Sequence, residues 1–313
     1  MDTADLQNIA SRTRLARQTG VALIIASALL TLFLFIPLTP ERGAGSNISE
    51  FLAADAFVNI PIIAKAAIVY DLALGKVLYA KNADAQLPLA SLTKLLTVYA
   101  ALTELSPTTQ ITVSSAAARA EPPHLFAPGD TLKLEDLARL TLTGSLNDGA
   151  AAIAEAAALH GGVSTLALLT AAAASLGLSE TYAVNSNGLD VNAVLSGGYS
   201  SARDVALLAG ALVEKASTIA LATTGDSASA TTLRGRALSI ANTNPNVGNT
   251  PHLLLSKTGY TDLAGGNLVL VFDAALGHPV AVVVLGSSEK DRFTDAQTLV
   301  AAALAHFAGI ASL

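Results

Sequence analysis

The sequence predicts an α+β fold in which one antiparallel sheet is built from both ends of the chain. Short β-rich runs occur early, over residues 66–70 and 76–79, and several longer ones follow residue 252. Between these two sets lie Ala-rich segments with helical periodicity, which predict an all-helical insert over about residues 95–215. The sheet is therefore expected to be flanked by helices, with the insert beside it.

Local signals place the individual elements. Leu74-Gly75 separates the two early β runs and predicts a hairpin. Asn147 or Asp148 is a candidate cap for one helix and Ser201 for another, whereas Asn185 to Ser200 is expected to be loop. The helices are expected from Ser91, over Leu134–Leu142, from Asn147 to Gly161, over Thr165–Ser175, Ala202–Leu212 and Asp295–Phe307. The later strands are expected over His252–Ser256, Asn267–Phe272 and Val280–Leu285.

Composition excludes several functional classes. Charged residues make up 13% of the 313 residues and the net charge is −6, which argues against a nucleic-acid partner. Cysteine is absent, so disulfides, thiolate catalysis and cysteine-ligated zinc are excluded. The five histidines are scattered and form no His-x-x-x-His pair. We therefore expect neither a metal nor another cofactor.

The N-terminal segment predicts a membrane anchor. Residues 20–38 carry no charge and are almost wholly apolar, close to the about 20 residues that cross a bilayer. Three arginines within residues 12–17 precede this segment, which places residues 1–19 in the cytoplasm. Residues 39–63 are then a linker, and residues 64–313 form a catalytic domain outside the cytoplasmic membrane. A cleaved signal peptide, with a cut near Ala44-Gly-Ser46, is the alternative.

A hydroxyl and an amine lie three residues apart in Ser91-Leu-Thr-Lys94, at the start of an apolar helix. Residues at this spacing share a helix face, so Lys94 Nζ can reach Ser91 Oγ and act as its base if burial keeps the amine neutral. Alone, the pair could be a helix cap and a solvated lysine. A second Ser-x-x-Lys, Ser287 to Lys290, lies in a polar turn and is discounted.

Two further polar triplets each occur once. Ser145-Leu-Asn147 lies in a turn between two expected helices, where both residues could simply form the turn. Lys257-Thr258-Gly259 lies inside a β run, where a cation is costly unless it faces a cleft or an edge. Triplets on a helix start, an interhelical turn and a strand suit an active site in the cleft between the helices and the sheet.

The order of these three motifs resembles the serine penicillin-recognising superfamily, and within it the low-molecular-weight D-alanyl-D-alanine carboxypeptidases, the peptidase S11-like penicillin-binding proteins. Other segments, such as Pro128-Gly-Asp-Thr-Leu and Tyr199-Ser-Ser-Ala-Arg-Asp, also resemble sequences of that family. The resemblance runs from about residue 64 to the end. It implies a β-lactamase/DD-peptidase-like fold. Two departures are Gly149, where the family usually has alanine, and Asn185-Ser-Asn-Gly188, which lacks the usual proline.

The resemblance implies a serine-type D-Ala-D-Ala carboxypeptidase of the bacterial cell wall. Its substrate would be the peptidoglycan stem peptide, and β-lactam antibiotics would be covalent inhibitors. Ser91 would attack the carbonyl, Lys94 would accept its proton, and Ser145 would relay a proton to the leaving amine. The residues expected to bind substrate are Asn147, Lys257, Thr258, Gly259, Tyr260 and Arg292, with the backbone N–H groups of Ser91 and Tyr260 forming an oxyanion hole.

Three other functions stay open. A DD-endopeptidase that cuts peptidoglycan cross-links would use the same residues. A class A β-lactamase is disfavoured, because Glu180 to Asn185 does not match the deacylation motif of those enzymes. A catalytically inactive protein that binds wall peptides is disfavoured by the intact Ser91, Lys94 and Lys257.

Overall fold

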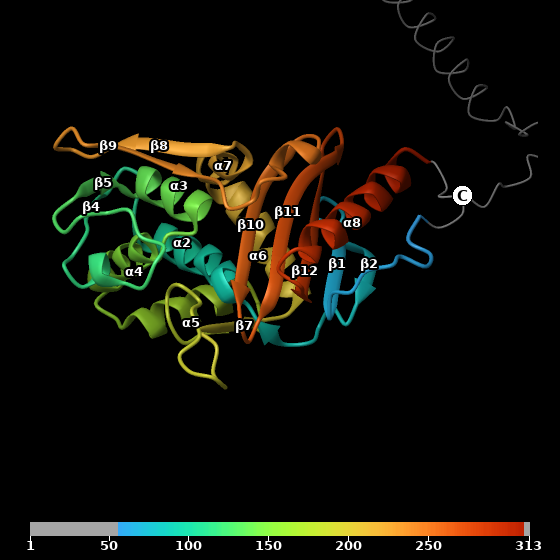
Figure 1. Cartoon of the computed structure of the whole chain (residues 1–313), viewed down its shortest axis with the longest axis horizontal. Helices are drawn as coiled ribbons and strands as arrows, with labels where there is room; N and C mark the ends of the chain where they lie inside the picture. The colour runs from blue at the N-terminus through green and yellow to red at the C-terminus, as the bar shows by residue number, and fades with distance from the viewer. Residues whose placement is uncertain (1–55, 310–313) are drawn as a thin grey trace, which may run out of the picture. The chain divides into compact units, whose positions relative to one another are not determined.

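The prediction that both ends of the chain build one sheet is confirmed in the computed structural model, which describes residues 56–309 (Figure 1). The sheet has five strands in the order β10-β11-β12-β1-β2, and every neighbouring pair is antiparallel. The strands are β1 (Ala66–Asp71), β2 (Lys76–Lys81), β10 (Leu253–Thr261), β11 (Gly265–Ala275) and β12 (His278–Ser287). The two chain ends meet where Ala66 pairs with Leu285 and Asp71 pairs with Val280.

Both faces of the sheet are buried, because its strands alternate apolar side chains between two cores. On β11, Leu268, Leu270 and Phe272 pack with the last helix, α8 (Asp291–Phe307). Val269 and Val271 point the other way, into the core that includes α6 (Ala202–Lys215). Figure 1 shows the sheet between these two helices. Strand β10 is left as an edge beside the helical block.

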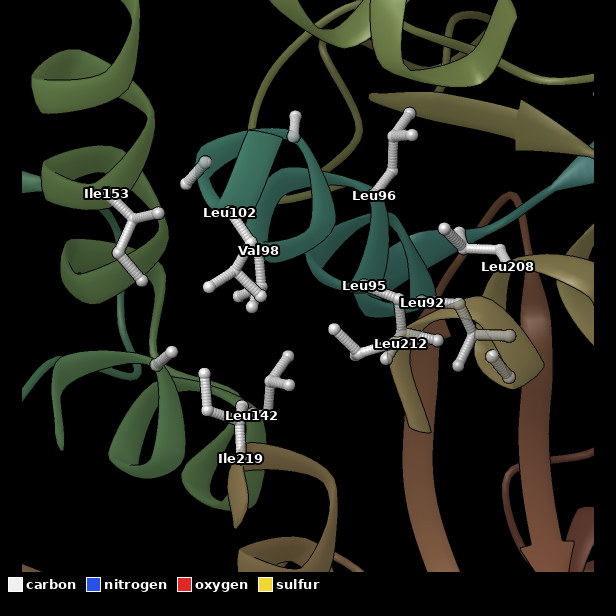
Figure 2. Close-up of a cluster of buried hydrophobic side chains, with 14 of the residues drawn as sticks. Leu92, Leu95, Leu96, Val98, Leu102, Leu142, Ile153, Leu208, Leu212 and Ile219 are labelled. Carbon is white, nitrogen blue, oxygen red and sulfur yellow. The ribbon is translucent and has the colours of Figure 1, made fainter. Parts of the chain in front are cut away.

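The helical block surrounds α2 (Thr93–Glu104), which a single 3-10 turn, η1 (Ala90–Leu92), precedes. The other helices of the block are α3 (Leu134–Gly144), α4 (Asn147–Gly161), α5 (Thr165–Ser175) and α7 (Ser217–Leu221). Figure 2 shows Leu95 and Val98 of α2 facing the neighbouring helices, represented by Leu142, Ile153 and Ile219. Burial on nearly every side fixes α2 in the core, so the residues at its start are held in place from behind.

Several details of the sequence prediction were wrong. The first helix begins at Thr93 rather than Ser91, which lies in the 3-10 turn. Neither Asn147 nor Asp148 is the cap of α4; the N-cap position is Leu146, and no side chain caps it. Ser201 does cap α6, as predicted, by accepting from the Asp204 N–H at 3.0 Å. The last helix starts four residues early, at Asp291.

Short strands were also missed. β3 (Leu87–Pro88), β7 (Gly198–Ser200) and β6 (Tyr182–Ala183) form a small sheet, so the expected loop ends in a strand. β8 (Ser227–Thr231) and β9 (Ala237–Ala241) form a hairpin that was not predicted. The β-rich run Gln110–Val113 does predict a strand, and it forms β4 (Gln110–Thr112), which pairs with β5 (Thr131–Lys133). The remaining 3-10 turns are η2 (Ala117–Arg119), η3 (Ala222–Thr224) and η4 (Val247–Asn249).

The predicted cytoplasmic segment 1–19, the anchor 20–38 and most of the linker 39–63 lie outside the described residues. Within residues 56–309, no single helix is both long and apolar enough to span a bilayer. Two sharply bent helix pairs, residues 147–175 and 202–224, reach that length and composition together.

Candidate active site

The predicted nucleophile, Ser91, lies on a tight turn that several distant segments hold. Ala90, just before it, has a φ of 49°, a left-handed conformation that non-glycine residues rarely adopt. The Asn267 amide donates to the Pro88 carbonyl at 2.9 Å and so ties this turn to β11. The backbone just before Ser91 is therefore constrained, while Ser91 itself stays partly exposed.

Lys94 is fully buried one helical turn after Ser91. Its Nζ lies 2.8 Å from Ser91 Oγ and 2.8 Å from the Asn187 carbonyl oxygen, to which it donates. Burial lowers the pKa of Lys94 well below its ordinary value, and the nearby charge of Lys257 lowers it further, while Asp148 opposes the change. A neutral amine suits this environment, because one N–H can bond Asn187 while the lone pair faces the serine hydroxyl.

Ser145 and Lys257 form a second buried pair. Ser145 closes α3 in a left-handed conformation with a φ of 57°, which turns its hydroxyl away from the helix. Lys257 Nζ donates to Ser145 Oγ at 2.9 Å and to the Thr258 carbonyl at 2.8 Å. Burial, together with the charge of Arg292, lowers the pKa of Lys257 to about 7. Lys257 can therefore change its charge near neutral pH.

Strand β10 approaches the nucleophile turn at Gly259. A Cβ at this position would lie 2.8 Å from the Leu89 carbonyl oxygen and 3.3 Å from the Leu92 nitrogen, so only glycine allows the contact. Arg292 of α8 is buried and donates from Nη1 to the Gly259 carbonyl at 2.8 Å. Thr258 Oγ1 bonds Thr243 Oγ1 at 2.7 Å, and Tyr260 is 46% exposed. The predicted residues of β10 and α8 thus lie together beside the turn.

Asn147 is oriented by the backbone of a preceding segment. Its Nδ2 donates to the carbonyls of Glu121 at 3.0 Å and Pro122 at 2.9 Å. Its Oδ1 is buried and has no hydrogen-bond partner in the described part of the chain. Because both amide hydrogens are used, any bond from Asn147 to substrate has to be accepted by Oδ1.

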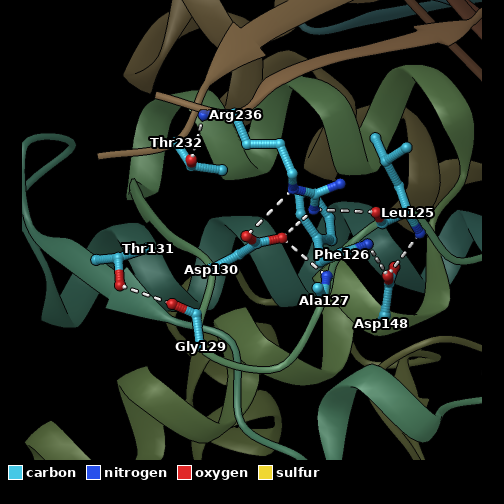
Figure 3. A network of polar contacts seen from close by, with 9 residues as sticks. All are labelled: Leu125, Phe126, Ala127, Gly129, Asp130, Thr131, Asp148, Thr232 and Arg236. Atoms are coloured by element: carbon cyan, nitrogen blue, oxygen red, sulfur yellow. Dashed lines mark hydrogen bonds and ion pairs between the residues drawn. The ribbon is translucent and has the colours of Figure 1, made fainter. Parts of the chain in front are cut away.

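Sequence reasoning offered Asp148, the next residue, only as a helix cap and missed its contacts with the segment before it. One carboxylate oxygen of Asp148 accepts from the N–H groups of Leu125 and Phe126, each at 2.7 Å (Figure 3). On the other side of this segment, Arg236 pairs with Asp130 and lies 3.4 Å from the Leu125 carbonyl (Figure 3). The segment 121–130 is therefore held between α4 and the β8–β9 hairpin. The signal was an acidic residue in the first turn of an Ala-rich helix.

The discounted Ser-x-x-Lys is not arranged as a pair. Ser287 donates to Asp295 Oδ2 at 2.7 Å, and Lys290 is exposed. Across residues 56–309, no group of three or more His, Asp or Glu side chains is arranged to hold a metal ion.

Comparison with known proteins agrees with this geometry. Residues 53–289 match the peptidase S11 family, described as D-alanyl-D-alanine carboxypeptidase. The chain belongs to this family. A D-alanyl-D-alanine endopeptidase of Pseudomonas aeruginosa is 30% identical over 284 residues, which cover 87% of this chain and 86% of that protein.

Solved structures of similar proteins share the fold. A D-alanyl-D-alanine carboxypeptidase from Mycobacterium tuberculosis superposes with a TM-score of 0.70 at 27% identity, covering 79% of this chain and 94% of that one. Penicillin-binding protein D2 from Listeria monocytogenes, in its ampicillin-bound form, gives a TM-score of 0.66 at 29% identity, covering 78% and 99%. The predicted family and fold class are therefore confirmed.

The glycine that departs from the usual family pattern has a packing reason. A Cβ on Gly149 would collide with Thr141 Oγ1 and lie 3.0 Å from the ring of Phe126. Thr141 occupies the space that an alanine methyl group would need. This member of the peptidase S11 family thus fills the first turn of α4 with a threonine from α3 instead.

Proposed function

We propose that this chain is a serine-type D-alanyl-D-alanine carboxypeptidase that removes the terminal D-alanine from peptidoglycan stem peptides through an acyl-enzyme. The observation that carries the proposal is the buried Lys94 amine with a lowered pKa, 2.8 Å from Ser91 Oγ. A serine hydroxyl needs such a base within hydrogen-bond reach to become a nucleophile.

Acylation follows from this pair. Ser91 Oγ attacks the carbonyl carbon of the penultimate D-alanine while its proton passes to Lys94 Nζ. The tetrahedral intermediate then collapses, the C–N bond to the terminal D-alanine breaks, and the leaving nitrogen receives a proton. Ser145 relays to this nitrogen the proton that Lys94 took from Ser91, which leaves Lys94 neutral again. A hydrogen bond from Lys257 Nζ orients the Ser145 hydroxyl.

Backbone N–H groups of Ser91 and Tyr260 stabilise the developing oxyanion. The contact of Gly259 with Leu89 supports this assignment, because it brings β10 against the nucleophile turn. Removing one such donor costs about 3–4 kcal/mol in other enzymes. The Asn147 Oδ1 accepts from a peptide N–H of the substrate.

The terminal carboxylate of the substrate is bound by the cationic end of the site. Lys257 and Arg292 supply the positive charge, the Thr258 hydroxyl supplies a donor, and Gly259 lets the backbone approach. An anion at this point favours the charged form of Lys257, so substrate binding raises its pKa. Water then attacks the acyl-enzyme, Lys94 acts as the base again, and Ser91 is regenerated.

The test is release of D-alanine from a synthetic pentapeptide by the full chain. Activity that disappears in Ser91→Ala, together with covalent labelling by fluorescent penicillin that also disappears, supports the proposal. A wild-type protein that takes no label and releases no D-alanine would instead be a binder of wall peptides. Turnover of a cephalosporin is the control for β-lactamase activity.

A DD-endopeptidase is the second candidate, and the similarity to the Pseudomonas aeruginosa endopeptidase favours it. The same residues would act, and the leaving amine would belong to a cross-link rather than to free D-alanine. Digestion of a purified cross-linked muropeptide dimer separates the two reactions. The carboxypeptidase proposal expects pentapeptide to be cleaved faster than dimer.

We further propose that residues 20–38 anchor the enzyme in the cytoplasmic membrane with residues 64–313 outside. This proposal rests on the apolar run and its basic flank. Extraction by detergent but not by high salt, with protease access from the outer side only, would support it. Release of a shortened soluble protein would indicate a cleaved signal peptide.

A further inference from the structure

We infer that Asn185 is a positioning residue for Lys94, acting through the backbone carbonyl of Asn187. The inference rests on the proposed role of Lys94 as the base for Ser91. The Asn187 carbonyl accepts from Lys94 Nζ at 2.8 Å, although the two residues are 93 positions apart. Whatever holds that carbonyl therefore helps to hold the amine.

The segment that carries this carbonyl has little regular structure of its own. Residues 184–189 begin the connection from β6 to β7, contain neither helix nor strand, and include no proline. The only backbone bond that anchors Asn185 in this stretch is from its N–H to the Gly197 carbonyl at 3.1 Å. Side-chain bonds must therefore supply most of the order.

The Asn185 amide supplies three such bonds. Its Oδ1 accepts from the N–H groups of Gly188 at 2.7 Å and Asn187 at 3.3 Å. Its Nδ2 donates to the Leu189 carbonyl at 2.9 Å. The side chain thus closes a turn around the Asn187 peptide and sets the direction of its carbonyl.

The amide also packs closely against Gly197. A Cβ on Gly197 would lie 2.5 Å from Asn185 Oδ1 and 2.6 Å from Nδ2, so the amide rests against a bare Cα. Beyond it, Gly188 has a φ of 82° and its Cα faces the Ala90 carbonyl so closely that a Cβ would collide there. The turn that Asn185 closes therefore packs directly on the residue before Ser91.

Loosening this turn should raise the pKa of Lys94. Burial is the largest cause that lowers the pKa of Lys94, and the segment 185–189 forms part of its cover. Water admitted beside Nζ would raise the pKa of Lys94, so more base would be protonated at a given pH. The charged groups that act on Lys94 from other elements, Lys257 on β10 and Asp148 on α4, are untouched by a change at Asn185.

The experiment measures the rate of acylation by fluorescent penicillin across pH in the full chain. Asn185→Ala is expected to slow acylation at neutral pH by about tenfold or more, because a small displacement of a base is costly. The acid limb of the profile is expected to move to higher pH. Asn185→Ser should give an intermediate shift, since a serine hydroxyl forms the same turn more weakly.

Asn192→Ala is the matched control. Asn192 Oδ1 accepts from the N–H groups of Val194 at 2.9 Å and Leu195 at 3.0 Å, in a turn whose bonds stay within residues 191–195. It is expected to keep the wild-type rate and profile. The melting temperatures of all variants separate a loss of folded protein from a change in the site.

An Asn185→Ala profile that coincides with that of Asn192→Ala would overturn the inference. If Asn185→Ala does not fold, Asn185→Ser decides, and an unmoved acid limb in that variant would also overturn it. Failure of the proposed function is distinguishable, because wild-type protein would then take no label that depends on Ser91.

Discussion

Lys94 and Lys257 are both buried lysines that bond one serine hydroxyl and one backbone carbonyl, yet their surroundings differ, and the proposed function gives them different tasks. Lys94 lies beside Ser91 on the helical side and has Lys257 as its charged neighbour. Lys257 lies on the edge strand beside Ser145 and has Arg292 as its charged neighbour. The difference teaches how neighbouring basic residues can be given separate roles. In the proposed function, burial and the charge of Lys257 keep Lys94 neutral, while Lys257 and Arg292 attract the anion.

Removing the base should have the largest effect. Lys94→Met is expected to lower the acylation rate by about 10²–10⁴-fold, the usual contribution of a general base. The melting temperature should not fall, because an apolar side chain replaces a buried amine. Lys290→Met, at the exposed lysine of the second Ser-x-x-Lys, is the control and should match the wild type. Near-normal acylation in Lys94→Met would show that the two lysines do not differ in the way proposed.

Removing the charge of Lys257 should mainly weaken substrate binding. Lys257→Met is expected to lower kcat/KM for a D-Ala-D-Ala peptide by about 10–100-fold, as for the loss of a charge-assisted hydrogen bond. The wild-type kcat/KM should fall as pH rises through about 7, since Lys257 loses its charge there. That alkaline limb should vanish in the variant. An alkaline limb that persists would mean that another group controls it.

Removing Arg292 should change the pKa of Lys257. Arg292→Gln removes a charge that lowers the pKa of Lys257, so that pKa should rise and the alkaline limb should move to higher pH. Loss of the bond to the Gly259 carbonyl should also lower kcat/KM by about tenfold. The pH profile of kcat/KM for the pentapeptide measures both. An alkaline limb that moves to lower pH would show that Arg292 does not lower the pKa of Lys257.

The smallest effect on acylation is expected from a change at Asp148, the buried carboxylate of α4. Asp148→Asn removes a charge that raises the pKa of Lys94, so the acid limb of acylation should move to lower pH. The free energy of unfolding should drop by about 1–3 kcal/mol, because the carboxylate accepts backbone N–H bonds that an amide cannot all replace. Urea denaturation and the acylation profile test the two parts separately. A shift to higher pH would contradict the account of Lys94.

The side chains that the structure brings together at the candidate site could be predicted from the sequence. The triplets that begin at Ser91, Ser145 and Lys257 lie far apart in the sequence. Each combines a reactive side chain with a local signal for a helix start, a turn or a strand. The sheet followed from short, continuous apolar runs at both chain ends that Gly-containing turns separate, a pattern that favours buried strands.

The rest of the site depends on backbone groups that no motif marks. The Asn187 carbonyl reaches Lys94 only because Gly188 packs on Ala90, and the Glu121 carbonyl reaches Asn147 only because α4 and the β8–β9 hairpin hold its segment. These contacts arise from long-range packing rather than local propensity. The β8–β9 hairpin itself was missed because the run Ser227–Thr231 is rich in alanine and serine, which do not favour strands.

The most direct measurement is the titration of Lys94 itself. In the full chain labelled with ¹³Cε-lysine, the resonance absent from Lys94→Met should report an amine whose pKa lies well below its ordinary value, so that Lys94 is neutral where the enzyme is acylated. A Lys94 resonance that stays protonated up to the ordinary range of lysine would contradict the account.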